Sequence, residues 1–505
     1  MPGQSGKYVC LSHCWGKTPI TCCTTIDTVG KAMDFLDYGA LPRNFQDAIT
    51  ITRRLDIQYI WIDSVCIIQD DKYDWEVESA KMADIYRYSY LTIAAASSAD
   101  STGGCFSSTN ADICMSLDDN TGRLLLVGAR MCDAMGTVND EAEVKKRFPL
   151  FQRGWVLQER LMSRRILYCN YGELAFECLE SKTCECGNSS LSPHVINGMG
   201  KREANLRHRL LMAKVSVPRG DLSLEWRSMV SSYTLLHLTK ANDILPAISG
   251  CARVISELTG DEYLAGMWKK SLSIELLWYI ETKRKFSRAA WTAPSWSWAS
   301  ISPGQEIFFL KPNLSSPWRT MLGESIQTVD CKTEGGNDLG QLVPGTGRLT
   351  LKSALLPCFV RRFCNESATA AQPSHDRRRF GLHYRVTIAN PAAACEVPVP
   401  ALESQDGQFV FYPDVRLGDE LWFDPFPACS ICSLARIWLL HIARKVDGGE
   451  CRDIFMMLKE IEASPNTYGR FGVTKFEGHT VGQRGRWFKE VWEKQAMPKR
   501  DFSIV

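Results

Sequence analysis

The sequence has no run of apolar residues long enough to cross a lipid bilayer, which takes roughly 20 residues. Its first residues also lack the basic stretch and apolar core that together mark a secretory signal peptide. These absences predict a soluble, cytoplasmic protein with no membrane span. In that setting the 20 cysteines of the 505-residue chain are expected to stay reduced.

The sequence has little net charge and few of the common ligand motifs. It carries 59 Lys and Arg residues against 57 Asp and Glu residues, a formal charge of +2, and no basic stripe. We therefore expect no nucleic-acid partner. We also find no GxGxxG or Walker loop, no internal repeat and no coiled-coil heptads.

The cysteine groups lack the partners of a zinc site. Cys178, Cys184 and Cys186 form one group, and Cys429 with Cys432 forms a CxxC pair. Neither group has a second pair or a histidine at zinc-finger spacing, which favours structural thiols. No metal is expected.

The stretch richest in chemistry lies between residues 59 and 86. Residues 59–62 are an apolar, β-branched and aromatic run, which predicts a strand covered on both faces. Asp63 is expected where that strand ends. After a polar loop, Asp74 is expected to cap a helix.

Glu78 is expected on the apolar face of this helix, between the directions of Met82 and Ile85. Burying an unpaired charge is costly, so a carboxylate on that face needs a partner, a proton or a cavity. Two interpretations stay open. Glu78 is either a glutamate at the rim of the core that bonds a nearby backbone N–H or a carboxylate that lines a binding site.

Strands and helices are expected to alternate along residues 8–169. The expected strands are 8–12, 59–62, 90–96 and 165–169, and the expected helices are 24–38, one from Pro42, one from Asp74, and 153–160. This alternation predicts an α/β domain with a parallel sheet that is covered on both faces. Ligands bind at the carboxyl edge of such sheets, so we expect Ser12, Asp63 and Glu78 to line one cleft.

The expected helix 153–160 contains four residues that can support such a site: Arg153, Trp155, Gln158 and Glu159. They are interpreted either as a packed helix with a surface ion pair or as groups that support the site. Both interpretations stay open.

The rest of the chain predicts two further regions. Residues 206–278 have a helical pattern, and Trp296 with Trp298 alternate as in a half-buried strand, which favours a core role over stacking on a base. Beyond Pro303, expected strands at 349–351, 384–388, 409–412, 421–423, 437–442 and 455–458 predict a β-rich region, with a short helix at 487–494.

Six motifs in chain order resemble the fungal heterokaryon-incompatibility (HET) domain. They are LSHCWG at 11–16, LPRNFQDAI at 41–49, YIWIDSVCIIQDD at 59–71, DWEVESAKMADIY at 74–86, LTIAAASSA at 91–99 and RGWVLQERLMSRRILY at 153–168. The resemblance implies a HET domain at 1–200, in which residues before Tyr8 are expected to be missing. A mainly helical accessory segment at 201–300 and the β-rich region at 301–505 would follow.

The resemblance implies a role in fungal non-self recognition as an effector of programmed cell death. HET domains are also similar to TIR domains, some of which hydrolyse NAD. By that likeness Glu78 and Asp63 are the candidate catalytic residues. NAD would be the substrate rather than a cofactor, held by Ser12, Trp15, Gly16, Gln69 and Trp75.

Two other interpretations stay open. The same surface would serve a non-enzymatic module that self-associates or binds an unknown receptor or incompatibility partner. Separately, Cys66 and His13 would be the nucleophile and base if the chain were a cysteine protease.

Overall fold

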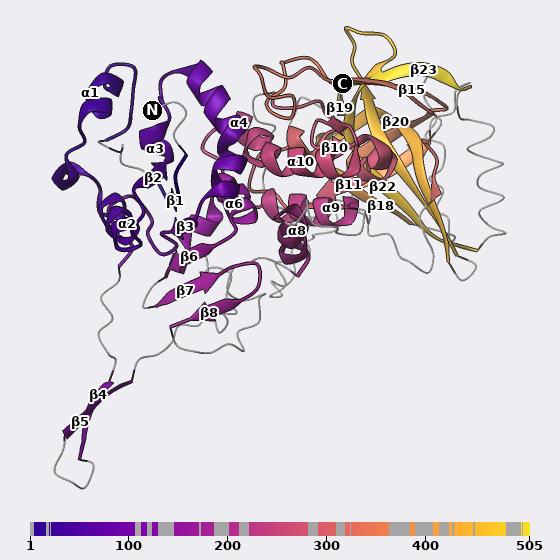
Figure 1. The fold of residues 1–505 in the computed structure, drawn as a ribbon. Coiled ribbons are helices and arrows are strands. Elements are labelled where there is room, and N and C mark those ends of the chain that lie inside the picture. Colours follow the sequence, from indigo (N-terminus) through magenta and orange to yellow (C-terminus); the bar gives the residue numbers. More distant parts are fainter. Residues whose placement is uncertain are drawn as a thin grey trace. The chain divides into compact units, whose positions relative to one another are not determined.

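The structure is a computed structural model (Figure 1). It describes residues 5–16, 20, 22–106, 113–118, 124–129, 146–170, 173–185, 201–211, 222–280, 291–309, 319–323, 325–362, 384–388, 408–413, 424–426, 429–447, 450–480, 496 and 498–505. The chain divides into two compact units. Unit 1 comprises Met1–Asp261 with Thr333–Gln341, and unit 2 comprises Glu262–Lys332 with Leu342–Val505. The predicted boundaries at residues 200 and 300 are not tested by this division and stay a prediction.

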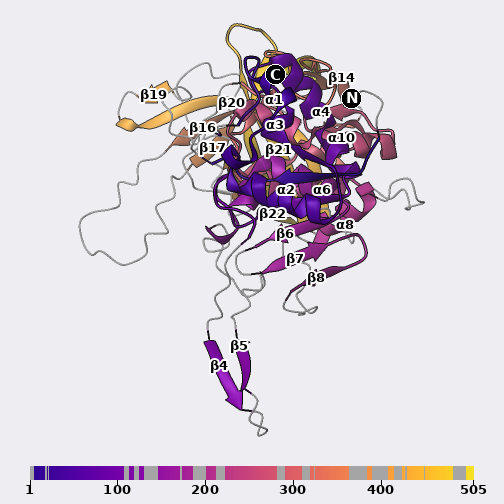
Figure 2. The same cartoon turned by 60° about the vertical axis from the view of Figure 1, so that its left-hand side comes forward.

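Unit 1 contains a six-stranded sheet in the order β2-β1-β3-β6-β7-β8. Its strands are β1 (Tyr8–Ser12), β2 (Tyr59–Ile62), β3 (Leu91–Ala94), β6 (Ile166–Cys169), β7 (Leu174–Glu177) and β8 (Lys182–Cys184). Strands β2, β1, β3 and β6 are parallel, which confirms the predicted parallel arrangement. Strands β7 and β8 add an antiparallel edge that was not predicted, and Figure 2 shows them beside β6.

The order of the strands explains where the helices lie. Helix α2 (Arg43–Arg54) connects β1 to β2 on one side, whereas α4 (Lys72–Tyr88) connects β2 to β3 on the other side of β1. Leu11 of β1 packs in the same apolar cluster as Phe45 of α2, while the Tyr86 hydroxyl of α4 donates to the Leu11 carbonyl oxygen at 3.3 Å.

Three expectations for the first hundred residues need correction. Strand β2 is not covered on both faces, because it is the edge strand and Tyr59 is 45% exposed. Helix α4 is capped by Asp71, whose carboxylate accepts from the backbone N–H groups of Tyr73 and Asp74. The expected helix 24–38 is shorter, with turns before α1 (Val29–Asp34) and the 3₁₀ helix η1 at Tyr38–Ala40. Threonine-rich turns compete with helix formation there.

The remaining elements of unit 1 are mostly helices. They are α3 (Asp63–Cys66), η2 (Pro149–Gln152), α6 (Gly154–Met162), α8 (Lys201–Leu211), α9 (Ser223–Tyr233), η3 (Ala241–Ile244) and α10 (Pro246–Thr259), with a hairpin of β4 (Ile113–Asp118) and β5 (Leu124–Ala129). Helix α6 follows the same direction of crossover as α4 and packs beside it, as Figure 1 shows. The predicted helix 153–160 is therefore confirmed, shifted by one residue at its start.

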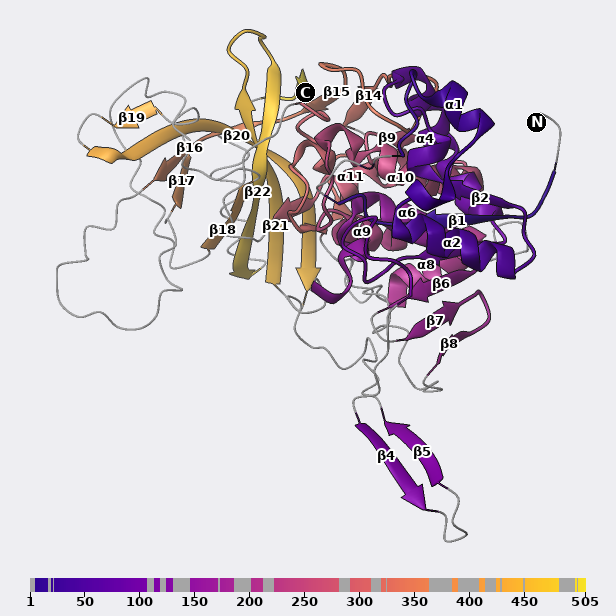
Figure 3. The ribbon, with the colours of Figure 1, turned by 90° about the vertical axis from the view of Figure 1, so that its left-hand side faces the viewer.

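Unit 2 contains an antiparallel-rich sheet. Its strands are β13 (Arg319–Thr320), β14 (Ile326–Asp330), β15 (Arg348–Ser353), β16 (Leu356–Arg362), β17 (Tyr384–Ile388), β18 (Gln408–Pro413), β19 (Asp424–Phe426), β20 (Cys429–Asp447), β21 (Glu450–Glu460), β22 (Thr467–Thr480) and β23 (Arg500–Ile504). Figure 3 shows β20, β21 and β22 side by side. The predicted β-rich character is confirmed. The predicted strand 421–423 and helix 487–494 lie outside the described residues.

Unit 2 begins with smaller elements. The helical pattern of residues 206–278 did not separate β9 (Tyr263–Leu264), β10 (Met267–Trp268), η4 (Lys269–Ser271), α11 (Leu272–Glu275) and the start of β11 (Trp278–Ile280). They are followed by η5 (Trp298–Ser300) and β12 (Ile307–Phe309). Trp296 and Trp298 do not form a strand, but both are fully buried, so their core role is confirmed. The Trp296 indole N–H donates to the carbonyl oxygen of Gly347, and the Trp298 indole N–H donates to that of Gly266.

Candidate functional site

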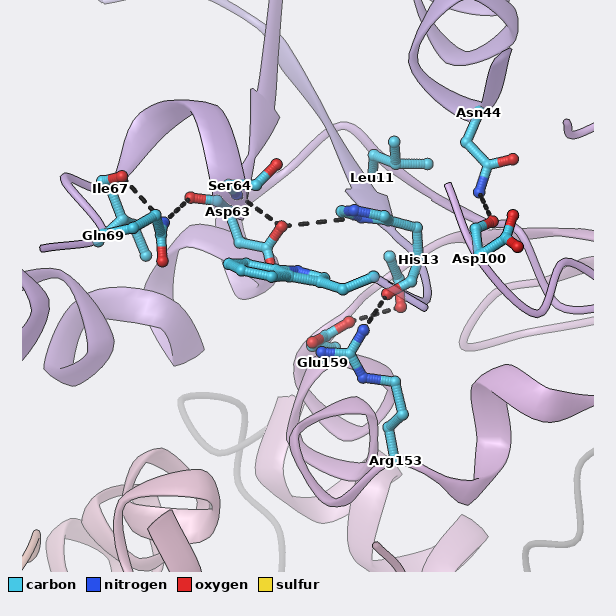
Figure 4. Close-up of polar contacts among 12 residues, drawn as sticks. Leu11, His13, Asn44, Asp63, Ser64, Ile67, Gln69, Asp100, Arg153 and Glu159 are labelled. Atoms are coloured by element: carbon cyan, nitrogen blue, oxygen red, sulfur yellow. Dashed lines mark hydrogen bonds and ion pairs between the residues drawn. The ribbon is translucent and has the colours of Figure 1, made fainter. Parts of the chain in front are cut away.

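The carboxyl edge of the parallel strands has the geometry of a ligand site. The chain leaves β1 for β2 on one side and reaches β3 on the other, so β1 and β3 form a switch point in strand order. Ligands of open α/β sheets bind beside such points. Ser12 is the last residue of β1. Asp63, labelled in Figure 4, directly follows β2. The polar residues after these strands therefore lie at the expected edge.

Ser12 and Glu159 form a buried pair between the sheet and α6. The Ser12 hydroxyl donates to Oε2 of Glu159 at 2.5 Å, and both residues are buried. The pKa of Glu159 is raised to about 7, mainly by desolvation and in part by the nearby Asp63 carboxylate, whereas the Ser12 hydroxyl, the Arg153 guanidinium and the Tyr86 hydroxyl oppose the rise. Perturbed carboxyl groups of this kind concentrate at functional sites.

Asp63 is held in one orientation by its neighbours. Its Oδ2 accepts a hydrogen bond from the Trp15 indole N–H at 2.8 Å, and its Oδ1 accepts from the Ser64 backbone N–H at 2.7 Å. The Asp63 side chain stays 19% exposed. A partly exposed carboxylate with a fixed direction is suited to contact a ligand.

His13 lies beside the Asp63 carboxylate. Its Nδ1 is 3.7 Å from Oδ1 of Asp63, and neither ring nitrogen has a hydrogen-bond partner within the described chain (Figure 4). Desolvation lowers the pKa of His13 to about 4. Arg153 binds the backbone here, since its guanidinium donates to the His13 carbonyl oxygen at 2.7 Å. Helix α6 is thereby tied to the loop that follows β1.

Gln69 and Gly16 shape the loops around the site. The Gln69 amide donates to the carbonyl oxygens of Asp63 and Ile67, at 3.0 and 2.9 Å, so its nitrogen holds the loop after β2. Gly16 has φ of +80°, and a Cβ there would collide with the Asp100 side chain. Glycine is required at this turn because it has no side chain to clash.

Glu78 lies on α4 outside the hydrogen-bonded group. Its Oε1 is 2.7 Å from Nζ of Lys81, and its side chain is 22% exposed. Within the described residues no hydrogen bond joins Glu78 to Ser12 or Asp63. The carboxylates of Glu78 and Asp63 both raise the pKa of Cys66, so both act on the same thiol. The structure thus supports a rim position for Glu78, which is one of the two alternatives that the sequence left open. This position is near α3.

The aromatic and amide residues of the predicted site brace neighbouring helices. The rings of Trp75 and Trp155 meet edge to face at 6.3 Å, and the Trp155 indole N–H donates to Asp243 at 3.0 Å. The Gln158 side-chain oxygen accepts from the Gly250 backbone N–H at 2.8 Å, which joins α6 to α10. These three residues hold the helices that carry the site.

The four predicted supporting residues therefore fall into two groups, according to whether they reach the polar edge. Arg153 and Glu159 reach the edge where Ser12 and Asp63 lie, whereas Trp155 and Gln158 face other helices. Sequence reasoning missed the part played by Tyr86, whose hydroxyl donates to the Leu11 carbonyl oxygen and lies close enough to Glu159 to lower the pKa of that carboxyl group. The available signal was its place on the apolar face of α4, which does not distinguish a core tyrosine from one that bonds a buried carboxylate.

The arrangement does not favour a cysteine nucleophile at Cys66. Desolvation raises the pKa of that thiol to about 11, whereas an activated cysteine has a lowered pKa. The His13 ring faces Asp63, with 3.7 Å between its Nδ1 and the Oδ1 of that carboxylate. Among the described residues, no group of three or more His, Cys, Asp and Glu side chains is arranged to hold a metal ion. No helix in the described ranges has the length and apolar character of a membrane span.

Comparison with known proteins gives one match. Residues 8–159 match a family model described as "Heterokaryon incompatibility protein (HET)". No curated protein and no solved structure matches the chain. The matched range begins at β1 and ends at Glu159, so it includes every residue of the polar edge described above. The resemblance of the six motifs is confirmed.

Proposed function

Residues 8–159 of this chain form a HET domain, and we propose that the protein is a cytoplasmic cell-death effector of fungal non-self recognition that hydrolyses NAD. The observation that carries the proposal is the polar edge at the switch point between β1 and β3. There, Ser12 and Asp63 lie near the Glu159 carboxyl group, whose pKa is raised to about 7. The strand order β2-β1-β3-β6 supports a TIR-like arrangement.

The exposed fractions of the Asp63, Glu78 and Glu159 side chains indicate different roles for the three residues. A catalytic residue must touch its substrate, and the side chains of Asp63 and Glu78 are 19% and 22% exposed. Glu159 is only 6% exposed and bonded to Ser12. We therefore assign Glu78 and Asp63 to substrate contact, and Glu159 to positioning of the edge.

The chemistry needs one accessible carboxylate beside the nicotinamide ribose. The bond between the ribose C1′ and the pyridinium nitrogen breaks, and its electron pair leaves with neutral nicotinamide. The positive charge that develops on the ribose is stabilised by the Glu78 carboxylate. A water oxygen then bonds C1′, and its proton passes to that carboxylate and on to solvent. The products are nicotinamide and ADP-ribose.

The remaining predicted residues would hold the substrate. The Trp15 ring is partly exposed and fixed through its indole N–H to Asp63, so it offers a face for stacking on a base. Asp63 keeps carboxylate oxygens for ribose hydroxyls. Gly16 would keep the loop close to the ligand. Trp75 and Gln69 would act mainly through the loops and helices they brace.

The test measures NAD loss by the purified full-length chain, free in solution and densely tethered to beads. We expect nicotinamide and ADP-ribose to form, and Glu78→Gln to slow the reaction by about 100-fold or more. Glu76→Gln is the matched control, since Glu76 lies on the same helix, is also 22% exposed and also pairs with a lysine. Intact NAD in both formats, with folded protein, would reject the proposal.

A second candidate is a non-enzymatic module that signals by assembly with another copy or a receptor. One observation favours it: no residue of α1 is buried, and large apolar side chains around it are exposed, with Met33 at 83% and Phe35 at 74%. Exposed apolar clusters often mark protein contacts. If a Met33→Ser/Phe35→Ser variant loses assembly and toxicity while Glu78→Gln keeps both, the assembly function holds and the catalytic one fails.

A further inference from the structure

A basic pocket lies at the opposite edge of the same parallel strands. It has a volume of about 460 Å³ and is lined by residues that precede β1, β3 and β6, together with the end of α4. The residues that matter for the argument are Lys7, Arg87, Tyr88, Tyr90, Arg164 and Arg165. Strands β1, β3 and β6 are parallel neighbours, so their amino ends meet at one edge. The pocket is therefore built by the sheet itself.

Four cations converge there without carboxylates. In the described part of the chain, no Asp or Glu forms an ion pair with Lys7, Arg87, Arg164 or Arg165. Cations gathered without counter-charge repel one another, and this repulsion is strongest where water is partly excluded. An anion in the pocket would remove it.

Arg87 gives independent support for a ligand. It is only 5% exposed, and its Nε is buried without a hydrogen-bond partner. Buried polar groups are normally satisfied, and a buried guanidinium is costly without a partner. Arg87 is one of the residues that line the pocket, so an anion bound there could supply the partner that the described chain does not.

Tyr88 and Tyr90 contact three of the four cations through their rings. Nζ of Lys7 and Cζ of Arg165 each lie 5.4 Å from the ring centroid of Tyr90, and Cζ of Arg87 lies 6.0 Å from that of Tyr88. The Arg165 guanidinium also donates to the Tyr90 carbonyl oxygen at 3.3 Å. Cation–π contacts orient side chains without neutralising their charge. The positive groups therefore stay available for an anion.

We propose that this pocket binds a phosphate-bearing anion, through the buried Arg87 and the exposed Lys7, Arg164 and Arg165. Arginine forks match the oxygens of phosphate groups, and several cations favour a ligand with more than one negative charge. The site is separate from the proposed NAD site, because the five residues of β1 span roughly 13 Å between the two edges. The phosphate would belong to a soluble compound or to a lipid head group.

The test is a calorimetric titration of the full-length chain with pyrophosphate at constant ionic strength. We expect saturable binding, weakened at least tenfold by the double variant Arg164→Gln/Arg165→Gln. The matched control is Arg53→Gln/Arg54→Gln, a second adjacent pair of exposed arginines, one of which also lies over a tyrosine ring. Absence of saturable binding, or an equal loss in the control variant, would overturn the proposal.

Two further arms make the result decisive. If the double variant does not fold, Lys7→Gln replaces it, since Lys7 is exposed and precedes the first strand. Sedimentation with phosphatidylcholine vesicles, with and without a phosphoinositide, identifies the source of the phosphate. Binding of phosphoinositide vesicles that depends on the same arginines assigns a lipid head group, whereas pyrophosphate binding alone assigns a soluble ligand. Vesicle binding that does not depend on them counts against the pocket.

Discussion

The hydroxyl of Ser12 donates to the carboxylate of Glu159 at 2.5 Å, although 147 residues separate the two along the chain. Ser12 ends β1 and Glu159 lies in α6, so this bond fixes a helix to the carboxyl edge of the sheet. Both residues are buried, which makes the bond stronger than it would be in water and a lost partner costly. The orientation of the candidate site therefore depends on this pair.

Glu159 should make stability fall as the pH rises. Its pKa is raised from 4.5 to about 7, so between these values the unfolded chain loses the proton more readily than the folded chain. The contribution of this group to the free energy of unfolding is fully present below about pH 4.5 and is lost as the pH rises through about 7. We expect Glu159→Gln to remove this component, about 3 kcal/mol at most, in urea unfolding measured across that range.

Glu78→Gln is the control for that experiment. It makes the same chemical change in a carboxylate that is paired with Lys81 and partly exposed, so it should retain the Glu159 component. If Glu159→Gln and the unaltered chain showed the same dependence on pH, the buried carboxyl group would not have the raised pKa described here.

His13 should have the opposite effect. Burial lowers its pKa from 6.5 to about 4, so between these values the unfolded chain binds a proton that the folded chain does not. Its contribution to stability is present above about pH 6.5 and is lost as the pH falls through about 4. In His13→Gln, urea unfolding should lose this acid-side decrease of about 3 kcal/mol at most. A decrease of unchanged size would mean that another group causes it.

Gly16→Ala should destabilise unit 1. Its φ of +80° disfavours any side chain, and an added Cβ would collide with Asp100. We expect a loss of at least about 1 kcal/mol in thermal or urea unfolding. Gly30→Ala is the control, because Gly30 lies in α1 with open space where the Cβ would be, and alanine favours helix there. Equal stability of the two variants would contradict the strain at Gly16.

Arg470 should be essential for the stability of unit 2. It is fully buried, its guanidinium donates to the carbonyl oxygens of Leu276 and Trp278 at 2.7 and 2.5 Å, and its Cζ lies 3.6 Å from the centroid of the Trp278 ring. Arg470→Met would leave buried carbonyl groups without these donors, which costs about 3 kcal/mol in urea unfolding. Arg348→Met is the matched change at an exposed position. It should have little effect, and similar losses in both would refute the role of burial.

Local sequence patterns determined most of the elements that carry the site. Strand β1 was predicted with its bounds, β2 with its bounds, and α6 within one or two residues at its ends. The reason is that apolar runs and helical spacing report backbone geometry over a few residues. The same information did not separate Asp71 from Asp74 as the cap of α4, because both are good cap residues a few positions apart.

Tertiary structure decided which carboxylate is buried. Glu78 and Glu159 both lie on expected helices, yet one pairs with Lys81 at the surface and the other bonds Ser12 in the interior. It also decided that four basic residues meet at the amino edge of the sheet. Burial and charge clustering arise from segments that are far apart in sequence, and no local pattern records which of them will pack together. By itself the sequence determined the match of residues 8–159 to the HET family model and the strands; the folded chain determined the surroundings of each charge.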